Sequence, residues 1–508
     1  MAKVEFWRMA TISSICANHQ VTAFHIAAVT EEKFRVYALT GFLLSQESLK
    51  AHAHVREDVF AAEWALRSLQ LPDHTFTDIR RLRSSWNNDI ADKCRKGLTE
   101  ISNYYHIRDL VICAKRGGYI VETPNDHAVI FKDTPDWPGI RDFKSRLISE
   151  RISAERNKDS VSNIQAEGFL RTRSAYDDFP HGLQASDYSG ATFWRLWEWL
   201  FNLSITVISE SCRVRNYGSY VATSETKELT ILITKKRMRD GLVRETGLSE
   251  SSISIFLGWL TFNSQTPKKF TLFHCPLVEI NDKFLMIIPH TLLMAHPPTI
   301  FLRLLAHYDK KVFDSASSEL ERQTLDRLKT HLEGRERITK TNIKLDTPIG
   351  KMELDFVEYN ESDLTLCIGQ AKLTVRADSV SEVDHTNEVL KEGMAQLERN
   401  KSIMCKNPAN IKILLEKIGA NTRENVNIEY FLLPTRFTGS DFLETPIWVK
   451  VLPIEFCLQP QCKGLSIRSI WTQYKTLWDS IDTKVISSKT QSEFELAGFK
   501  ICYPGFAV

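Results

Sequence analysis

The stretch GKMELDFVEYNESDLTLCIGQAKL, residues 350–373, carries the strongest fold signal in this chain. Apolar residues dominate both of its halves, and a polar group at 360–363 separates them. This pattern predicts two strands joined by a short turn. Four polar side chains interrupt the apolar runs: Glu353, Asp355, Gln370 and Lys372.

Strand geometry predicts where these polar side chains point. Residues two apart share a face of a strand, so Glu353 and Asp355 are expected together, as are Gln370 and Lys372. The intervening residues are mostly apolar and suit a covered sheet. Because buried charge without partners is costly, we expect a divalent cation among these groups.

The available donors suit a hard cation. Mg²⁺ prefers carboxylate, carbonyl and water oxygens. Asp355, the amide oxygen of Gln370 and the backbone carbonyl of Ala371 supply such atoms. Lys372 would lie beside an attacking water and a phosphate and offset developing negative charge. The pattern therefore predicts a Mg²⁺ site, open to Mn²⁺ as well, for phosphodiester hydrolysis.

The flanking segments predict the rest of an α/β unit. A helix is expected at 315–333, where Ser317 or Ser318 would cap an apolar stripe. Further elements are expected in this order: a strand at 338–345, a turn at 347–350, a helix at 382–399 after the hairpin, and strands at 428–433 and 448–456.

In this order, residues 310–455 resemble the PD-(D/E)xK nuclease superfamily. Asp355 matches the family's Asp, and Gln370-Ala371-Lys372 its (D/E)xK element, in a Gln-x-Lys form similar to Mrr-type restriction endonucleases. Residues 350–355 also look like that family's lead-in, and Gln396 loosely matches a helical Gln. The same tripeptide pattern recurs at 461–463, so the discriminating feature is the order of elements.

The resemblance implies a restriction-endonuclease-like core with a mixed central sheet and a Mg²⁺-dependent endonuclease acting on DNA. It implies that Glu321 assists through a water or a second metal, and that Glu353 orients Lys372 or holds a second ion. Three alternatives stay open: a solvated hairpin, a DNA-binding or sensor protein with a degenerate nuclease-like domain, and an RNA nuclease.

The preceding residues, 1–225, are expected to form a helix-rich mixed region of unknown role. Helices are expected at 49–69 and 86–106, short strands within 109–131, and a boundary within 148–163. The aromatic stretch 192–203 suits a core helix, with a base-stacking platform as its alternative.

Residues 226–300 resemble the helix–turn–helix of winged-helix DNA-binding domains. Gly247 would occupy the turn, Ser249 would cap the second helix, and that helix would bury Ile253 together with Phe256 or Leu257. Two strands are expected within 271–290. DNA reading and a purely structural helical hairpin both remain open. Overall, we expect a multidomain α+β or α/β chain.

The final segment, 456–508, is a C-terminal extension with an amphipathic helix at 470–481. We expect this helix to pack on the nuclease-like domain, 301–455, or to make a homodimer contact. Lys and Arg total 65 and Asp and Glu 63, a balance that argues against a polybasic tail protein.

Several functional classes lack their sequence signals. The chain has no apolar run of membrane-spanning length and no secretory signal, and its ten scattered cysteines suit reduced thiols, so we expect a cytoplasmic protein. It also has no phosphate-binding loop, so any ATPase or targeting function is expected from a partner protein. Analogy with restriction nucleases favours a role in bacterial or antiviral defence.

Overall fold

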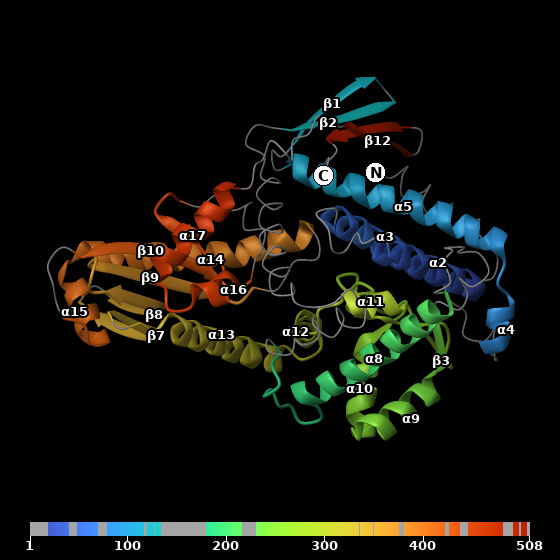
Figure 1. Cartoon of the computed structure of the whole chain (residues 1–508), viewed down its shortest axis with the longest axis horizontal. Coiled ribbons are helices and arrows are strands. Elements are labelled where there is room, and N and C mark those ends of the chain that lie inside the picture. The colour runs from blue at the N-terminus through green and yellow to red at the C-terminus, as the bar shows by residue number, and fades with distance from the viewer. Residues whose placement is uncertain are drawn as a thin grey trace.

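The structure is a computed structural model of a mixed helix and sheet protein (Figure 1). Its strands, among the described residues, form three sheets. The described residues are 19–39, 48–69, 79–115, 119–125, 127–133, 179–215, 230–334, 336–348, 350–374, 380–421, 426–436, 446–480, 491–496 and 499–504.

The N-terminal region contains α2 (His19–Leu39), α3 (Ser48–Ser68), α4 (Ile79–Ser84) and α5 (Asn88–Lys115). The helix predicted at 49–69 is confirmed. The prediction of strands from residue 109 is wrong as far as Lys115, because Ile107, Leu110 and Ala114 continue a helical spacing into one apolar cluster.

Two strands follow this long helix, β1 (Tyr119–Asn125) and β2 (Ala128–Asp133), and they pair antiparallel. The boundary predicted within 148–163 lies outside the described residues.

The middle region begins with α8 (Gly190–Arg215), in which Phe193, Trp194 and Trp197 are buried. This burial confirms the core helix predicted at 192–203 and contradicts a base-stacking role for these three rings. After α8 come β3 (Ile231–Thr234), α9 (Lys235–Thr246), α10 (Glu250–Leu260), β4 (Thr261–Phe262), β5 (Leu277–Glu279), β6 (Phe284–Ile287), α11 (Pro289–Met294) and α12 (Pro297–Tyr308).

The predicted helical pair is confirmed in detail. Gly247 has a φ of 65° between α9 and α10, and the Ser249 hydroxyl accepts the N–H of Ser252 as the N-cap of α10. Ile253 and Phe256 are fully buried. The strands predicted within 271–290 are present but short, and the Asn281 side chain accepts the N–H of Phe284 in the turn between them.

One buried core includes side chains from α2, α3, α5 and α8 together with α9 to α12. The predicted boundary near residue 226 therefore does not separate two hydrophobic cores. Among the helices in the described ranges, none is long and apolar enough to cross a membrane.

A second body is built on a five-stranded sheet with the order β11-β10-β9-β8-β7. Its elements are α13 (Lys310–Leu332), β7 (Arg337–Thr347), β8 (Gly350–Asn360), β9 (Thr365–Lys372), α14 (Val380–Lys406), α15 (Ala409–Ile418), β10 (Asn427–Pro434) and β11 (Val449–Val451). The pairs β7–β8 and β8–β9 are antiparallel, whereas β9–β10 and β10–β11 are parallel. The sheet is therefore mixed, as predicted.

Helices cover both faces of this sheet. On one face α13 packs with α16 (Ile454–Cys457) and α17 (Ile467–Ser480), and on the other lie α14 and α15. The helix predicted at 315–333 begins earlier, because Asp309 rather than Ser317 or Ser318 caps it, accepting the N–H of Val312 at 3.1 Å. The strand predicted at 448–456 ends at Val451, and the helix α16 follows Pro453.

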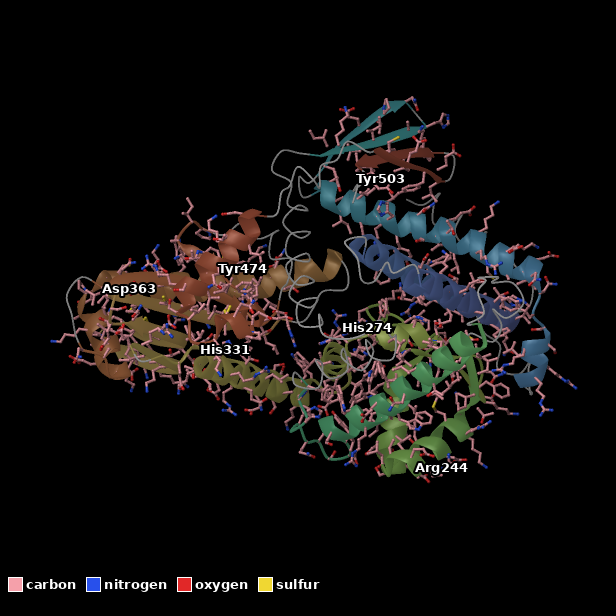
Figure 2. The ribbon with its side chains drawn as sticks, viewed as in Figure 1. Arg244, His274, His331, Asp363, Tyr474 and Tyr503 are labelled. Atoms are coloured by element: carbon pink, nitrogen blue, oxygen red, sulfur yellow. The ribbon has the colours of Figure 1, made fainter. Side chains whose placement is uncertain are left out.

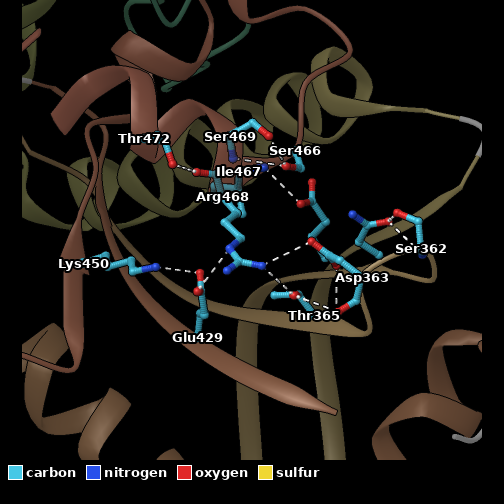
Figure 3. Close-up of polar contacts among 12 residues, drawn as sticks. Ser362, Asp363, Thr365, Glu429, Lys450, Ser466, Ile467, Arg468, Ser469 and Thr472 are labelled. Carbon is cyan, nitrogen blue, oxygen red and sulfur yellow. Dashed lines mark hydrogen bonds and ion pairs between the residues drawn. The ribbon is translucent and has the colours of Figure 1, made fainter. Parts of the chain in front are cut away.

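Elements of the C-terminal segment pack both on the five-stranded sheet and on the N-terminal region. Side chains of α17 join the core under α13, which confirms that the predicted amphipathic helix packs back. Figure 3 shows Arg468 of α17 bonded to Asp363, Thr365 and Glu429. The strands β12 (Gln491–Leu496) and β13 (Phe499–Pro504) then join β2 in a separate sheet, where Tyr503 lies 4.6 Å from the His106 ring of α5 (Figure 2).

Candidate active site

The candidate site lies where β8 and β9 separate. Their backbone register ends at Phe356 and Gly369, whereas β9 stays paired with β10 as far as Lys372 and Pro434. Beyond the end of the β8–β9 register, the N–H of Ala371 donates to a side chain, Oδ2 of Asp355, at 2.9 Å. The carboxylate of Asp355 thus accepts a hydrogen bond that a backbone carbonyl accepts in a regular strand pair.

A kink in β7 and β8 coincides with Asp355. Asn342 in β7 has a φ of 53°. Its neighbour Thr341 pairs with Phe356 across the two strands, and its neighbour Ile343 pairs with Leu354, so Asn342 lies opposite Asp355. Leu354 packs on the α14 face of the sheet and Phe356 on the α13 face, although they are two residues apart. The strand alternation therefore breaks at Asp355, which places its carboxylate at the opening.

The structure brings four of the predicted residues together. Asp355 is 8% exposed and Gln370 6% exposed, and the Gln370 amide nitrogen donates to Asp355 Oδ2. From α13, Oε2 of Glu321 accepts the N–H of Leu373 at 3.3 Å. The charge of Lys372 acts on both Asp355 and Glu321. Two carboxyl groups, an amide and a lysine are thus gathered near the carboxyl end of β9, the central strand of the sheet.

Glu353 lies outside this buried group. Its side chain is 62% exposed and lies 3.7 Å from Lys344 Nζ across the β7–β8 pair. The alternation of β8 breaks at Asp355, so the shared face predicted for Glu353 and Asp355 is not seen, and the Glu353 side chain reaches water. Gln396 is likewise exposed on α14.

Burial controls the charge of the two carboxyl groups. Burial is the largest influence and raises the pKa of Asp355 from 3.8 to about 6. The hydrogen bond from the Ala371 N–H opposes this rise in pKa. Among the nearby charges, Glu321 raises the pKa of Asp355, Lys372 lowers it and Glu353 raises it. Burial also raises the pKa of Glu321, opposed by the Leu373 N–H and by Lys372. Burial thus makes the ionised form of both carboxyl groups less favourable than it would be in water.

The donor chemistry fits a hard cation. Within the described residues, Asp355 Oδ1 and Glu321 Oε1 accept no hydrogen bond, so each carboxylate retains a ligand atom. The Gln370 amide now turns its nitrogen toward Asp355. A rotation of the amide would turn its oxygen there instead, as a cation ligand requires. No three His, Cys, Asp or Glu side chains of the described chain form a metal-binding group, so a cation here would need amide or carbonyl oxygens as well.

The contribution of α14 to the site was not predicted from the sequence. Asn400 donates to the Glu353 carbonyl and Arg399 to the Lys351 carbonyl, each at 3.2 Å. Both carbonyls lie in the part of β8 that β9 no longer accompanies. Gly393 approaches Lys372 closely. A glycine inside a helical pattern was the available signal, because such a residue usually has a packing reason.

Comparison with protein-family models, with curated proteins and with solved structures found no match to this chain.

Proposed function

We propose that the chain is a Mg²⁺-dependent nuclease that hydrolyses phosphodiester bonds in DNA. The observation that carries this proposal is the meeting of Asp355, Gln370, Lys372 and Glu321 where β8 and β9 separate. A buried group of charged side chains at a strand opening has a cost that a catalytic role explains.

The order of elements supports the same proposal. A helix, three antiparallel strands, two helices and a parallel strand follow one another from α13 to β10. This is the arrangement expected of a restriction-endonuclease-like core, and the Gln-x-Lys element lies at the carboxyl end of β9.

Each side chain has a distinct role in this proposal. Asp355 and Glu321 would hold the cation, joined by the Gln370 amide oxygen and the Ala371 carbonyl. A bound Mg²⁺ would make water more acidic and polarise the phosphate. Lys372 would orient that water and stabilise the charge that develops on the phosphate.

The neutral Gln370 has an electrostatic consequence. Asp355, Glu321 and Lys372 together carry a charge of about −1 when all are ionised, so a divalent ion would leave the site about +1. A site with net positive charge favours an anionic phosphate. The Gln-x-Lys variant is therefore compatible with activity at the expense of metal affinity.

The direct test is cleavage of linear, supercoiled and single-stranded DNA with Mg²⁺, Mn²⁺ or EDTA. Lys372→Ala is expected to keep the fold and lower hydrolysis by at least about 10²-fold. Lys463→Ala is a matched control, since Gln461-Cys462-Lys463 has the same residue pattern at the end of a short 3₁₀ helix, where the Lys463 side chain is exposed. Wild-type cutting by Lys372→Ala, or equal losses in both variants, would refute the assignment.

A second function is favoured by one observation. The segment from α8 to β6 has helix, strand, two helices and three strands, and β6 lies between β3 and β5. This order is that of a winged-helix DNA-binding domain. A DNA-binding or sensor protein with a degenerate nuclease-like domain would give a salt-sensitive gel shift without metal-dependent cutting.

The cleavage assay also separates the remaining alternatives. An RNA nuclease on the same site would cut RNA and spare DNA. Cytoplasmic location, homodimer formation, a partner supplying ATPase or targeting, and a role in bacterial or antiviral defence belong to this proposal as expectations.

A further inference from the structure

The stem of Lys372 crosses α14 at a glycine. A β-carbon placed at Gly393 would lie 3.0 Å from Lys372 Cγ, 3.2 Å from Lys372 Cε and 2.7 Å from Leu432 Cδ1. Carbon atoms in contact normally lie about 3.5–4.0 Å apart. Any side chain at 393 would therefore displace the lysine stem, the Leu432 side chain or both.

The Leu432 side chain has little room to move, because Leu432 is fully buried in β10. Lys372 is half-buried, at the carboxyl end of β9. The lysine stem is therefore the more movable of the two neighbours.

The same helix also holds the strand that bears Asp355. Asn400, which is 4% exposed, donates to the Glu353 carbonyl two residues before Asp355. One rigid helix thus contacts the backbone of β8 and the side chain of Lys372, the two parts that must be aligned for the proposed chemistry.

We infer that Gly393 is a positioning residue, whose missing side chain leaves the space in which the Lys372 stem lies and so fixes the ammonium beside Asp355 and Glu321. This inference rests on the proposed hydrolytic function. Glycine in a helix interior is less favourable than alanine by about 1 kcal/mol, so its presence here needs a packing reason.

The primary experiment compares Gly393→Ala with Glu392→Ala, a change at the adjacent exposed position of α14. We expect Gly393→Ala to lower kcat by about 10²-fold with KM close to wild type, because a displaced catalytic group costs rate rather than substrate binding. The unfolding midpoint should fall modestly, since the 2.7 Å contact with the buried Leu432 must also be relieved. Glu392→Ala should retain the wild-type kcat. A wild-type kcat in Gly393→Ala would overturn the inference.

Two further variants separate positioning from simple crowding. Leu432→Val, added to Gly393→Ala, removes the contact with Leu432 Cδ1 but keeps the one with Lys372, so kcat should stay low. Full recovery of kcat would show that core crowding was the cause. In a Lys372→Ala background, Gly393→Ala should cause no further loss, and an independent loss would contradict the coupling.

A measurement that does not depend on catalytic activity distinguishes failure of this inference from failure of the proposed function. Reductive ¹³C-methylation labels the lysine amines, and the Lys372 NMR signal is the one that Lys372→Ala removes. Gly393→Ala should move that signal, whereas Glu392→Ala should not. An unmoved signal would refute the positioning role even in a protein that cuts no DNA.

Discussion

Replacing Asp355 by Asn should stabilise the metal-free protein above pH 6. Burial raises the pKa of this carboxyl from 3.8 to about 6, which corresponds to about 3 kcal/mol at 1.36 kcal/mol per pKa unit. The pKa of this carboxyl is higher in the folded than in the unfolded protein. Its contribution to the free energy of unfolding is therefore fully present below pH 3.8 and is lost as the pH rises through about 6. The asparagine variant carries no such charge.

The magnitude therefore depends on pH in a defined way. The gain in the free energy of unfolding for Asp355→Asn should be about 0.5 kcal/mol at pH 4, about 1.5 at pH 5 and up to about 3 at pH 8. Asn retains an oxygen that can accept the Ala371 N–H, so the bond that replaces the strand pairing can be kept.

The assay is urea unfolding followed by circular dichroism from pH 4 to 8. Buried Glu63 and Glu358, each with a pKa raised to about 7 by burial, also make stability pH-dependent, so the informative quantity is the difference between variant and wild type. Asp346→Asn is the control, since that side chain is 84% exposed on β7 and should show no such trend. Equal stability of Asp355→Asn and wild type at pH 8 would refute the reasoning.

Magnesium extends the same experiment. A cation held by Asp355 would remove the cost of its buried charge, so Mg²⁺ should raise the unfolding midpoint of the wild type and leave Asp355→Asn unchanged. A midpoint that Mg²⁺ raises equally in both proteins would place the cation elsewhere.

Two further predictions concern the framework. Arg468→Ala should lower the free energy of unfolding by only about 0.5–1 kcal/mol, because its side chain is 45% exposed and Lys450 still pairs with Glu429; a loss above 3 kcal/mol in urea would contradict this view. Gly247→Ala should cost about 1–2 kcal/mol in the same assay, since its φ of 65° disfavours a β-carbon although the surrounding space is open. An unchanged midpoint would show that the turn can rearrange.

The elements around the site were predictable because local signals agreed with the fold. Alternating apolar residues marked β8 and β9, and the polar turn between them fixed the hairpin. The helical pair was likewise readable from Gly247 and Ser249, since each performs the backbone role its residue type suggests. Signals of this kind act within a few residues, so tertiary packing does not alter them.

The errors arose where distant packing decided the outcome. Glu353 lies two residues before Asp355, yet the two side chains do not share a face, because the alternation of β8 breaks at Asp355. The kink at Asn342 could not be read from β8, because its cause lies on the neighbouring strand. Nothing in the C-terminal sequence indicated that β13 pairs with β2, a contact between opposite ends of the chain.

The separation of β8 from β9, more than the identity of the charges, makes this site. If the two strands had stayed paired through Asp355 and Gln370, the N–H of Ala371 would meet a backbone carbonyl instead of a carboxylate. The carboxyl group would then lose the donor that opposes the effect of burial on its pKa. The separation leaves two β8 carbonyls without a partner on β9, and side chains of α14 donate to both of them. The opening is therefore present without a ligand. A preformed opening of this kind avoids the cost of rearranging buried strands each time a cation and a phosphate bind.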